Sequence, residues 1–596
     1  MKPLIYLLCT FTLLWTSSTF AQDFDLKWSD KMRYDNFKDG FFKEYVGASD
    51  QFVYGLNNNL SLGKKASEKK LKLLAFDKTS MRQVKQIALK DNKDKNRVNQ
   101  IKGFDYLKTV VMKDAIFVFW KKSVKDVTEV YAESFDLELN RVLKLKKVYK
   151  IVYPHRKKTL FSGLSGNNPL VIMRGETDNN TILIGSEISN GKNENYDFDY
   201  IVLESAGEEI SKGKIELPEV QTSRNSSRSS TYTFGKDGNV YIKSYVRMNP
   251  SEIKNAKKGE NRSYAVLDIL NPESADLTTY ILKYDNLNIF DIGFVVQDDH
   301  VKIYGFFNDF AKDSYGRKTH GIFTTKVDSG SSEVSEPKLS YFDKRTLDEL
   351  FKNDKEERKS SQKKKKKIGK NKGNEEESLA YNYVIEDAKV VNDDLVLFCS
   401  RMYNYSVTTC TSSGSGGQSC TTRYYCSKSN VTAFKLNTEG EILWASNVDR
   451  QITYNGWDVY DLKIVTKDDK FYVLYGSAYE AAAETKNRKS AKKRTEMRDE
   501  FQYATFDIED GSIEKRDFIV NKPGVKKAER KYVKPAQITV LDNQYFINSS
   551  RITMKPALTV AGCAASLACP PIIYFVFLSG SMRKGTGHMG TLEVIE

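Results

Sequence analysis

Cysteine is the residue type whose number and spacing most directly suggest chemistry in this chain. Apart from Cys9 in the apolar N-terminal stretch, the chain has six cysteines: Cys399, Cys410, Cys420, Cys426, Cys563 and Cys569. An even number in an exported chain favours disulfide bonds over thiols. A zinc site is the alternative, but no Cys-x-x-Cys pair occurs, and spacings of five or more intervening residues suit zinc poorly.

Four of these cysteines lie in one segment, 395–429, whose Gly/Ser-rich centre indicates a hairpin tip. Because the tip lies between Cys410 and Cys420, we expect a disulfide at its base, with Cys399 and Cys426 as an outer bridge. Cys399 and Cys410 are an odd number of residues apart and point to opposite faces of a strand, whereas Cys420 and Cys426 share a face. The two bridges together therefore require a bulge or a broken strand.

The same hairpin is rich in tyrosine, with Tyr403 and Tyr405 on its first arm and Tyr424 and Tyr425 on its second. Tyrosine combines a large apolar body with a polar hydroxyl and is common at the centre of interfaces. We hypothesise that the hairpin presents a contact surface. The alternative is a disulfide-stapled protrusion that binds nothing.

Lysine and arginine outnumber the acidic residues, and the formal net charge is +15. The basic residues cluster in segments 155–158, 254–262, 486–498 and 522–534, and in a run of five: Lys363, Lys364, Lys365, Lys366 and Lys367. If these segments are loops on one rim, the rim attracts polyanions over a Debye length of about 8 Å. The alternative is a set of solvated loops that confer solubility. Nucleic acid is not expected as a partner of an exported chain without base-stacking motifs.

A segment of 27 residues without a charge, 556–582, precedes the C-terminus. Its paired prolines, Pro570 and Pro571, disfavour a membrane-spanning helix. It is either a buried extension of the last repeat or a protrusion that touches a membrane or a partner. We expect a Cys563–Cys569 disulfide across its tip.

Signatures of catalytic centres are missing from the sequence. The four histidines show no His-Glu-x-x-His spacing, and no Gly-x-Ser-x-Gly segment occurs. Catalytic carboxylates cannot be chosen among 78 acidic residues without geometry. We therefore assign no catalytic, metal-binding or cofactor-binding residue, and expect no cofactor.

The N-terminal residues 1–21 have the pattern of an export signal, with Lys2, an apolar stretch from Leu4 to Trp15, and small residues near Ala21. A membrane-spanning helix, which needs about 20 apolar residues, is the alternative. Because Cys9 follows Leu8 and lies inside the apolar stretch, we expect no lipid anchor. We expect export to the periplasm, the outer-membrane surface or the medium.

The elements that carry these residues repeat along the whole chain. Strongly apolar runs, expected to be second strands, begin at Gln51, Ala115, Pro169, Asn239, Val301, Leu395, Phe471 and Gln544. Alternating runs, expected to be third strands, begin at Lys72, Val130, Asp199, Tyr264, Gly321 and Val431. Eight units of about 70 residues predict an all-β, eight-bladed β-propeller of four-stranded blades, with seven blades as the alternative. We expect one propeller domain over 22–596, with a disordered basic loop near 355–378.

The two ends of the chain predict how the ring closes. The segment 590–596 resembles a third strand and has no fourth strand after it, whereas 24–31 resembles a fourth strand. We therefore expect the N-terminal strand to complete the last blade. The alternative is a frayed N-terminal tail.

Two resemblances accompany these patterns. The segment from Thr432 to Trp444, with Gly440 in its turn, resembles the tryptophan-docking repeat of quinoprotein-like propellers. That resemblance implies that Trp444 packs between blades, with Trp28 in an equivalent place, but it implies no quinone cofactor. The whole chain resembles exported repeat proteins of Gram-negative bacteria that carry a lysine-rich insertion (here 363–372) before a tyrosine-rich hairpin (403–425), and this implies no activity.

Two functions follow as hypotheses. The first is a non-catalytic binding or scaffold protein that recognises an envelope protein or an acidic polysaccharide through loops on one face, with peripheral membrane contact through 556–582. The second is a propeller hydrolase or lyase that acts on an acidic glycan, which needs a cluster of carboxylates or a histidine with a metal at the ring axis. A quinone-dependent oxidoreductase is a weaker third option.

Overall fold

The computed structural model describes most of the chain between residues 24 and 594. The described residues are 24–35, 41–58, 70–91, 101, 103–153, 170–175, 180–189, 196–217, 229–235, 237–247, 263–284, 286–297, 300–312, 318–328, 334–351, 379–380, 383–412, 418–456, 460–476, 500–519, 533, 538–554 and 583–594.

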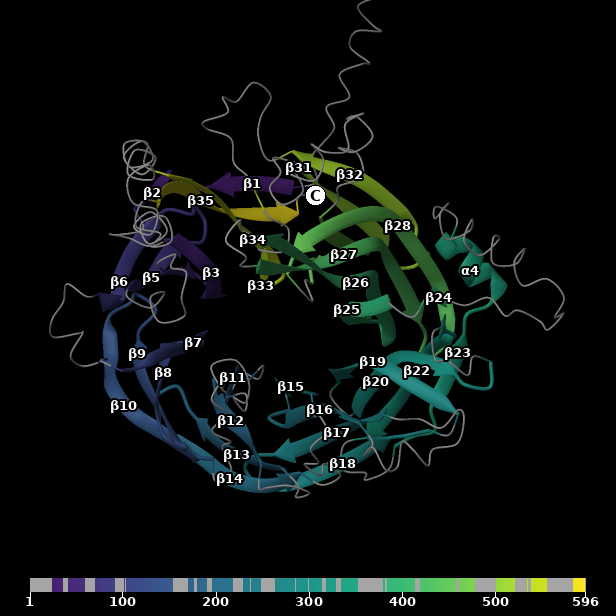
Figure 1. Ribbon diagram of the computed structural model, residues 1–596, viewed down its shortest axis with the longest axis horizontal. Helices are drawn as coiled ribbons and strands as arrows, with labels where there is room; N and C mark the ends of the chain where they lie inside the picture. Colours follow the sequence, from purple (N-terminus) through teal and green to yellow (C-terminus); the bar gives the residue numbers. More distant parts are fainter. Residues whose placement is uncertain are drawn as a thin grey trace, which may run out of the picture.

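The described strands form eight antiparallel sheets, each built on four main strands, that are arranged in a ring around one axis (Figure 1). One four-stranded sheet cannot bury both of its faces alone, and neighbours around a ring cover them. The predicted eight-bladed β-propeller is therefore confirmed, and the alternative of seven blades is wrong.

The first four blades follow the chain without interruption. Blade 1 consists of β3 (Phe41–Ala48), β4 (Phe52–Asn58), β5 (Lys70–Asp77) and β6 (Gln83–Asp91). Blade 2 consists of β7 (Asp105–Val111), β8 (Ile116–Val124), β9 (Val127–Phe135) and β10 (Arg141–Val152). Blade 3 consists of β11 (Leu170–Arg174), β12 (Ile182–Ser189), β13 (Tyr196–Leu203) and β14 (Glu209–Leu217). Blade 4 consists of β15 (Ser229–Phe234), β16 (Val240–Arg247), β17 (Ser263–Asn271) and β18 (Asp276–Leu282).

The last four blades include two long strands and the N-terminal strand. Blade 5 consists of β19 (Leu287–Val296), β20 (His300–Asp309), β22 (Gly321–Asp328) and β23 (Lys338–Tyr341). Blade 6 consists of β25 (Tyr383–Val391), β26 (Asp394–Ser412), β27 (Gln418–Leu436) and β28 (Ile442–Asn455). Blade 7 consists of β29 (Lys463–Lys467), β30 (Lys470–Tyr475), β31 (Glu500–Asp507) and β32 (Ile513–Ile519). Blade 8 consists of β33 (Thr539–Leu541), β34 (Gln544–Met554), β35 (Arg583–Val594) and β1 (Phe24–Trp28).

Four smaller elements accompany the blades. The strand β2 (Met32–Asp35) pairs with β35, and β21 (Lys318–Thr319) pairs with β24 (Leu379–Ala380). The helix α4 (Lys344–Phe351) packs on blade 6, where the carbonyl of Leu350 accepts a 2.9 Å hydrogen bond from the Asn447 side chain. No helix among the described residues is long and apolar enough to cross a membrane.

The N-terminal strand closes the ring, as predicted. Strand β1 pairs antiparallel with β35, from Phe24 opposite Val594 to Trp28 opposite Gly590. The first strand of the chain is thereby the fourth strand of the last blade. Backbone hydrogen bonds between two segments far apart in the sequence thus hold the circle together.

Eight hydrophobic clusters complete the ring, and each joins side chains from two adjacent blades. The cluster between blades 7 and 8 contains Phe24 of β1 and Tyr503 of β31, and the cluster between blades 8 and 1 contains Phe546 and Tyr45. Because every pair of neighbours shares such a cluster, the hydrophobic core runs around the ring.

The strand order corrects one detail of the repeat alignment. The run beginning at Pro169 was expected to be a second strand, but Leu170–Arg174 is the first strand of blade 3. The second strand is β12, which is almost wholly buried, whereas β11 is mostly half-buried. Both runs are apolar, so the pattern alone did not separate them.

Polar two-residue turns join the first and second strands of several blades. In the turn between β25 and β26 both Asn392 and Asp393 have positive φ, and so do Asp542 and Asn543 between β33 and β34. Positive φ at both central residues defines the type I′ turn, whose twist matches that of paired strands, and Asn and Asp tolerate it. This explains the polar pairs that end the first strands.

Candidate binding hairpin

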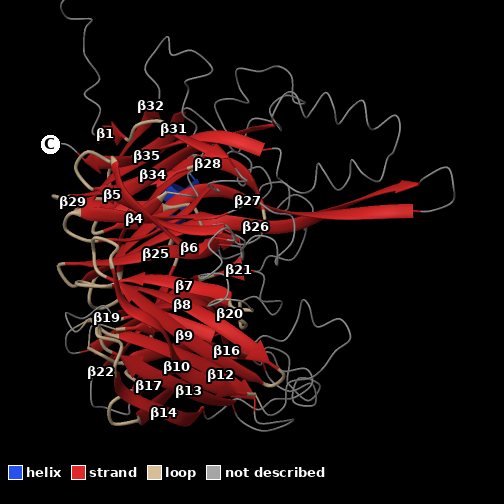
Figure 2. Ribbon diagram, turned by 90° about the vertical axis from the view of Figure 1, so that its left-hand side faces the viewer, coloured by secondary structure: helices blue, strands red, loops and turns tan. Residues whose placement is uncertain are grey.

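The longest described strands of the protein form one hairpin, β26 and β27, which have 19 residues each. They pair continuously from Arg401 opposite Ser429 to Ser412 opposite Gln418. The neighbouring strand β25 stops at the Tyr383–Arg401 pair, and β28 stops at the Tyr425–Asn455 pair. The hairpin therefore continues as a two-stranded ribbon, which projects from one face of the ring (Figure 2).

A disulfide closes this ribbon near its tip. Cys410 and Cys420 are directly opposite each other and are bonded, with their Cα atoms 4.0 Å apart. The predicted Cys410–Cys420 bridge is confirmed. Closing a loop of this size contributes about 2–3 kcal/mol by restricting the open hairpin.

The predicted outer bridge is wrong, because Cys399 and Cys426 are not bonded to each other. In the ladder, Cys399 lies opposite Thr432, whereas Cys426 lies opposite Asn404. The two cysteines are thus several rungs apart, which is too far for a disulfide. The expected bulge is present between Cys399 and Arg401, and burial raises the pKa of the Cys399 thiol well above its ordinary value.

Three of the four predicted tyrosines form a stack on one face of the hairpin. The rings of Tyr403 and Tyr405 are 5.9 Å apart between centroids, and those of Tyr405 and Tyr425 are 5.2 Å apart, each pair nearly parallel. Tyr405 and Tyr425 are opposite each other in the ladder, and Tyr403 is two residues before Tyr405. Alternation along each strand places Val407 and Arg423 on the same side. We call these five residues the tyrosine face: Tyr403, Tyr405, Val407, Arg423 and Tyr425.

The tyrosine face is exposed, although apolar side chains make up much of it. Tyr403 is 56% exposed and Val407 is 45% exposed. Tyr424, the fourth predicted tyrosine, is also exposed but lies on the other face, opposite Ser406. The segment from Leu395 to Asn437 contains no aspartate or glutamate. The hairpin therefore combines exposed aromatic surface with an excess of positive charge.

A cluster of buried charges lies at the root of the hairpin, and we call its four residues the root cluster: Glu386, Lys428, Arg450 and Asp461. The Lys428 ammonium is 2.7 Å from a Glu386 oxygen and 3.3 Å from an Asp461 oxygen. The Arg450 guanidinium is 2.8 Å from Asp461 and 3.3 Å from Glu386. The exposed fraction of each side chain is at most 1%. Two cations and two carboxylates thus balance one another without water around them.

Further hydrogen bonds join Asp461 and Arg450 of the root cluster to neighbouring side chains. The Tyr454 hydroxyl donates to Asp461 over 2.6 Å, and Arg450 donates to the Ser400 hydroxyl over 2.6 Å. Although burial alone would raise it, the pKa of Asp461 is lowered by the positive charges of Arg450 and Lys428. The Asp461 carboxylate is therefore held ionised.

The root cluster joins three strands of blade 6 to the segment that precedes blade 7. Lys428 and Arg450 come from the hairpin arm β27 and its neighbour β28, and Glu386 comes from β25 of the same blade. Asp461 precedes β29 of blade 7. The hairpin is therefore anchored to the next blade through its face opposite the tyrosine face, where Cys426, Ile452 and Tyr454 also pack together.

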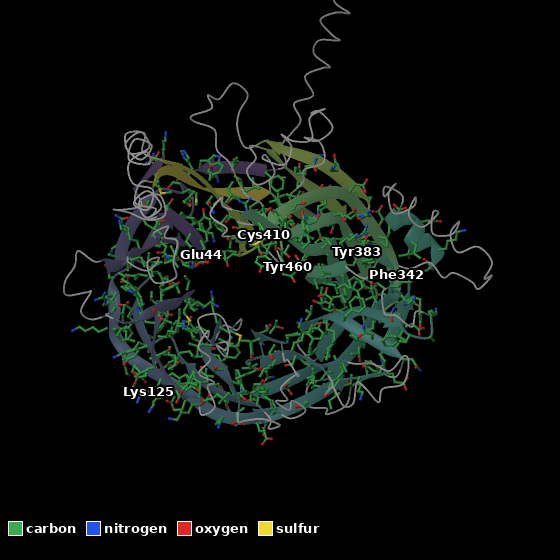
Figure 3. The ribbon with its side chains drawn as sticks, in the orientation of Figure 1. Glu44, Lys125, Phe342, Tyr383, Cys410 and Tyr460 are labelled. Atoms are coloured by element: carbon green, nitrogen blue, oxygen red, sulfur yellow. A yellow bond between two sulfur atoms is a disulfide. The ribbon has the colours of Figure 1, made fainter. Side chains whose placement is uncertain are left out.

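An exposed aromatic ring lies over this anchor. The Tyr460 ring centroid is 5.2 Å from the Lys428 ammonium, and Tyr460 is 49% exposed. In Figure 3 Tyr460 lies at the inner edge of the ring, whereas Lys125 lies at the outer edge. Of the four exposed tyrosines among the described residues, three belong to the hairpin or its root: Tyr403, Tyr424 and Tyr460.

The sequence reasoning missed the root cluster. One signal was available: Lys428 alternates with Cys426 and Asn430, and all three are buried. A lysine whose side chain points to the buried face of a strand requires a carboxylate partner. Its partners could not have been chosen, because Glu386 and Asp461 are distant in the sequence.

Carboxylates on the inner strands also connect successive blades. Asp291 of β19 accepts a hydrogen bond from the backbone N–H of Ile385 in β25. In the same way, Glu386 of β25 accepts from the N–H groups of Asp461, at 3.0 Å, and Leu462, at 3.2 Å. Burial raises the pKa of Asp291 to about 6. These acids hold the backbone of the following blade.

One described histidine and the acids at the hairpin root have structural partners. His320 is buried, and its Nδ1 accepts a 3.0 Å hydrogen bond from the N–H of Asp309. Among the described residues no group of three or more His, Cys, Asp or Glu side chains could hold a metal ion. The described acids nearest the hairpin root, Glu386 and Asp461, bind backbone and ion-pair partners.

Trp444 packs between two blades, as its repeat motif implies. Its indole N–H donates a 3.3 Å hydrogen bond to the carbonyl of Ile508 in blade 7, and its ring lies against Gly511. Ser446, on the same strand, donates to the Gly511 carbonyl over 2.6 Å. Trp28 lies over Gly590 of its own blade and packs against the hydrophobic cluster between blades 7 and 8.

Several predicted features lie outside the described residues. They are the export signal at 1–21, the loop near 355–378 with Lys363, Lys364, Lys365, Lys366 and Lys367, and the segment 556–582 with Cys563 and Cys569. The other basic segments also fall almost wholly there.

No protein-family model matches this chain, and no curated protein matches it. Among solved structures, it is similar to the Dos1 propeller, at 6% identity and a TM-score of 0.35, over 88% of this chain and 92% of that one. It is similar to the propeller domain of the Trilobed protease from Pyrococcus furiosus, at 10% identity and a TM-score of 0.31, over 82% and 98%. The polysaccharide lyase Uly1 is similar at 11% identity and a TM-score of 0.31, over 82% and 89%. No step of the functional argument depends on these likenesses.

Proposed function

We propose that this chain is an exported, non-catalytic binding or scaffold protein that recognises an envelope protein or an acidic polysaccharide through the β26–β27 hairpin. The observation that carries the proposal is the tyrosine face, in which the exposed Tyr403 stacks with the half-buried Tyr405 and Tyr425 on a ribbon that projects from the ring. Covering exposed aromatic surface with a partner is favourable, because it removes that surface from water.

The construction of the hairpin supports a binding role. The root cluster fixes one end of the ribbon and the Cys410–Cys420 disulfide fixes the other. A contact surface held in one conformation loses less entropy when it binds. The disulfide also fits an oxidising compartment outside the cytoplasm.

The charge of the hairpin supports a partner with negative groups. The acid-free segment from Leu395 to Asn437 carries Arg401 and the exposed Arg423. Its two lysines, Lys428 and Lys435, are instead paired with carboxylates outside this segment. Opposite charge increases the rate of encounter and orients the partner. The proposal includes the basic loops and segment 556–582 as further contacts on the same protein.

A trimmed hairpin tests the proposal. Replacing residues 403–427 by Asn-Gly removes the three stacked tyrosines and joins Met402 to Lys428, which are already paired, through a two-residue turn. We expect co-sedimentation of the protein with the envelope fraction of the producing cells to fall by about tenfold or more. Unchanged co-sedimentation of the trimmed protein would remove the hairpin from the function.

A pair of matched valines separates the tyrosine face from exposed apolar surface in general. Val407 on the hairpin is 45% exposed, and Val84 on β6 is 54% exposed. We expect V407S to weaken co-sedimentation by about threefold to tenfold and V84S to leave it unchanged. Equal effects of the two substitutions would contradict recognition by the tyrosine face.

A further inference from the structure

We infer that the edge of β26 that faces away from β27, which we call the outer edge of the hairpin, binds an extended, acidic segment of a partner protein beyond Arg401 as an additional strand. The inference rests on the proposed function and names the class of partner for the same hairpin. It is carried by the hydrogen-bonding edge of the ribbon, which is an observation separate from the tyrosine face.

The first step is the pairing of β26. The outer edge of the hairpin is paired with β25 only as far as Arg401, whereas the other edge of β26 is paired with β27 as far as Ser412. From Tyr405 to Ser412, no described strand lies along the outer edge of the hairpin. At about 3.3 Å per residue, this part of the edge is roughly 26 Å long. A strand edge of this length is a template for another strand.

The second step is the phase of the hydrogen bonds. In an antiparallel pair, residues whose Cα atoms are about 4.5 Å apart exchange no backbone hydrogen bonds with each other. Cys410 and Cys420 are such a pair, with their Cα atoms 4.0 Å apart. Residues in the phase of Cys410, which include Ser406 and Thr408, therefore direct their N–H and C=O groups away from β27. The outer edge of the hairpin thus offers donors and acceptors at a spacing that matches a strand.

The third step is the absence of the features that usually protect an edge. Exposed edges commonly carry lysine, proline or a bulge. The outer strand β10, for comparison, carries Lys144, Lys146, Lys147 and Lys150. The edge from Tyr405 to Ser412 contains no charged residue, proline or glycine, and its ladder with β27 shows no bulge. Its Tyr, Val and Thr residues favour strand pairing.

The fourth step is the chemistry of the occupant. The hairpin has no carboxylate, and Arg423 is exposed, so an acidic segment complements it. A second copy of this chain is disfavoured as the occupant, because each copy carries a net charge of +15. A peptide with carboxylates on alternate residues can place them beside the arginine while its backbone pairs with β26.

The edge of the ribbon favours a peptide over a polysaccharide. Backbone N–H and C=O groups along β26 can pair with the backbone of an added strand, whereas a polysaccharide has no such backbone. The exposed ring of Tyr403 and its neighbours Tyr405 and Tyr425 offer a surface against which the side chains of the added strand can pack.

The test uses the full-length protein and labelled peptides of about nine residues in fluorescence anisotropy. The probe alternates glutamate with valine, and a second peptide replaces glutamate by lysine. A third is the acidic peptide with alternate backbone nitrogens methylated, so that one of its edges cannot donate hydrogen bonds. Alginate serves as the acidic polysaccharide.

The protein variants alter the backbone of the edge or only a side chain. T408P removes an outward N–H, and T408V keeps the backbone while removing the hydroxyl that is 2.9 Å from the Thr422 hydroxyl. S406P removes the next outward N–H. Formation of the Cys410–Cys420 disulfide in each variant checks that the hairpin still forms.

We expect the wild type and T408V to bind the acidic peptide equally, and T408P and S406P to bind it at least about tenfold more weakly. The lysine peptide and the methylated peptide should bind at least about tenfold more weakly than the acidic peptide. Equal binding of the acidic peptide by wild type and T408P, or of the methylated and unmethylated peptides, would overturn the inference.

Two further outcomes separate this inference from the proposed function. If the wild type binds alginate and no peptide, and the trimmed hairpin binds neither, strand addition is overturned while recognition by the hairpin stands. If the trimmed and wild-type proteins behave alike toward every probe and toward the envelope fraction, both are overturned.

Discussion

At the scale of single residues, the root cluster is a balance of buried charges in which each member compensates the others. Glu386, Lys428, Arg450 and Asp461 are held within ion-pair distance and have almost no exposed surface. Ion pairs of this kind are costly to bury and more costly to break. Removing any one of the four side chains should therefore destabilise the whole cluster at the root of the hairpin.

Removal of Lys428 should be strongly destabilising. K428M leaves two buried carboxylates with one cation, and we expect it to lower the free energy of unfolding by about 3–5 kcal/mol. The double variant K428M/E386Q restores charge balance and should recover part of this loss. Urea denaturation followed by tryptophan fluorescence measures both. A double variant no more stable than K428M would contradict the charge-balance account.

Asp291 should make the stability of the ring depend on pH. Burial raises its pKa to about 6 in the folded chain from 3.8, so the folded state binds the proton more tightly than the unfolded state. Its contribution to stability is therefore complete below about pH 4 and is lost as the pH rises through about 6.

The variant D291N lacks this titration. The stability of the wild type relative to D291N should fall by about 2 kcal/mol between about pH 4 and about pH 7. Denaturation midpoints of both proteins across this range provide the measurement. Asp199, whose pKa is also raised to about 6 by burial, is present in both proteins and cancels. A stability difference between the wild type and D291N that does not change with pH would show that burial does not raise the pKa of Asp291.

At the scale of elements, tight contacts between a turn of one blade and a strand of the next fix the spacing of the blades. Gly511 has a φ of 69°, and a Cβ at this position would lie 2.5 Å from the Trp444 ring. Gly238 has a φ of 79° and no atom within 4 Å of the same position. The two glycines share a backbone conformation and differ in their surroundings.

This pair isolates the packing of Trp444. We expect G238A to cost about 1 kcal/mol, because of the left-handed backbone alone. G511A adds overpacking against the indole and should cost about 2–4 kcal/mol in total. Thermal denaturation of the two variants provides the comparison. Equal losses would mean that the turn yields without disturbing Trp444.

The disulfide should stabilise the hairpin and leave the ring unaffected. Cys410 and Cys420 connect only the two arms of the ribbon, beyond the last contact with β28. Replacing both by serine should make amide hydrogen exchange in 402–426 faster, by an amount that corresponds to about 2–3 kcal/mol. The global denaturation midpoint should stay within experimental error. A large drop in that midpoint would contradict the separation of hairpin and ring.

Sequence patterns predicted elements better than the contacts between them. The turn residues, the second strands and the Cys410–Cys420 bridge follow from local spacing, which is visible along the chain. The Cys399–Cys426 bridge failed because it depended on the register of two arms across a bulge, and a shift of a few rungs separates the sulfurs. The root cluster was invisible, since Lys428 finds its partners in β25 and in blade 7.

At the scale of the whole molecule, self-similarity was enough to predict the ring and its closure. An N-terminal run of fourth-strand character and a C-terminal run without a partner predicted the β1–β35 pair, which the structure contains. Blade 3 was misaligned because β11 and β12 are both apolar, so that either run fits the pattern of a second strand. The partner stays a prediction, because its identity depends on a molecule other than this chain.

Closure through β1 should account for a large share of the stability. Phe24 is 3% exposed and packs edge-on against Tyr503, with ring centroids 4.7 Å apart. F24A should lower the free energy of unfolding by about 3–5 kcal/mol. K27A, on the same strand, removes an exposed ion pair with Glu593 and should cost less than about 1 kcal/mol. Similar effects of F24A and K27A would contradict a ring locked by β1.

The central claim, that the hairpin is the recognition element of this propeller, is tested most directly by hydrogen–deuterium exchange of the intact protein with and without the envelope fraction of its producing cells. The claim predicts that exchange slows in 402–426 and stays the same in the inner strands of the blades. Protection that appears on the inner strands while 402–426 exchanges as before would contradict it.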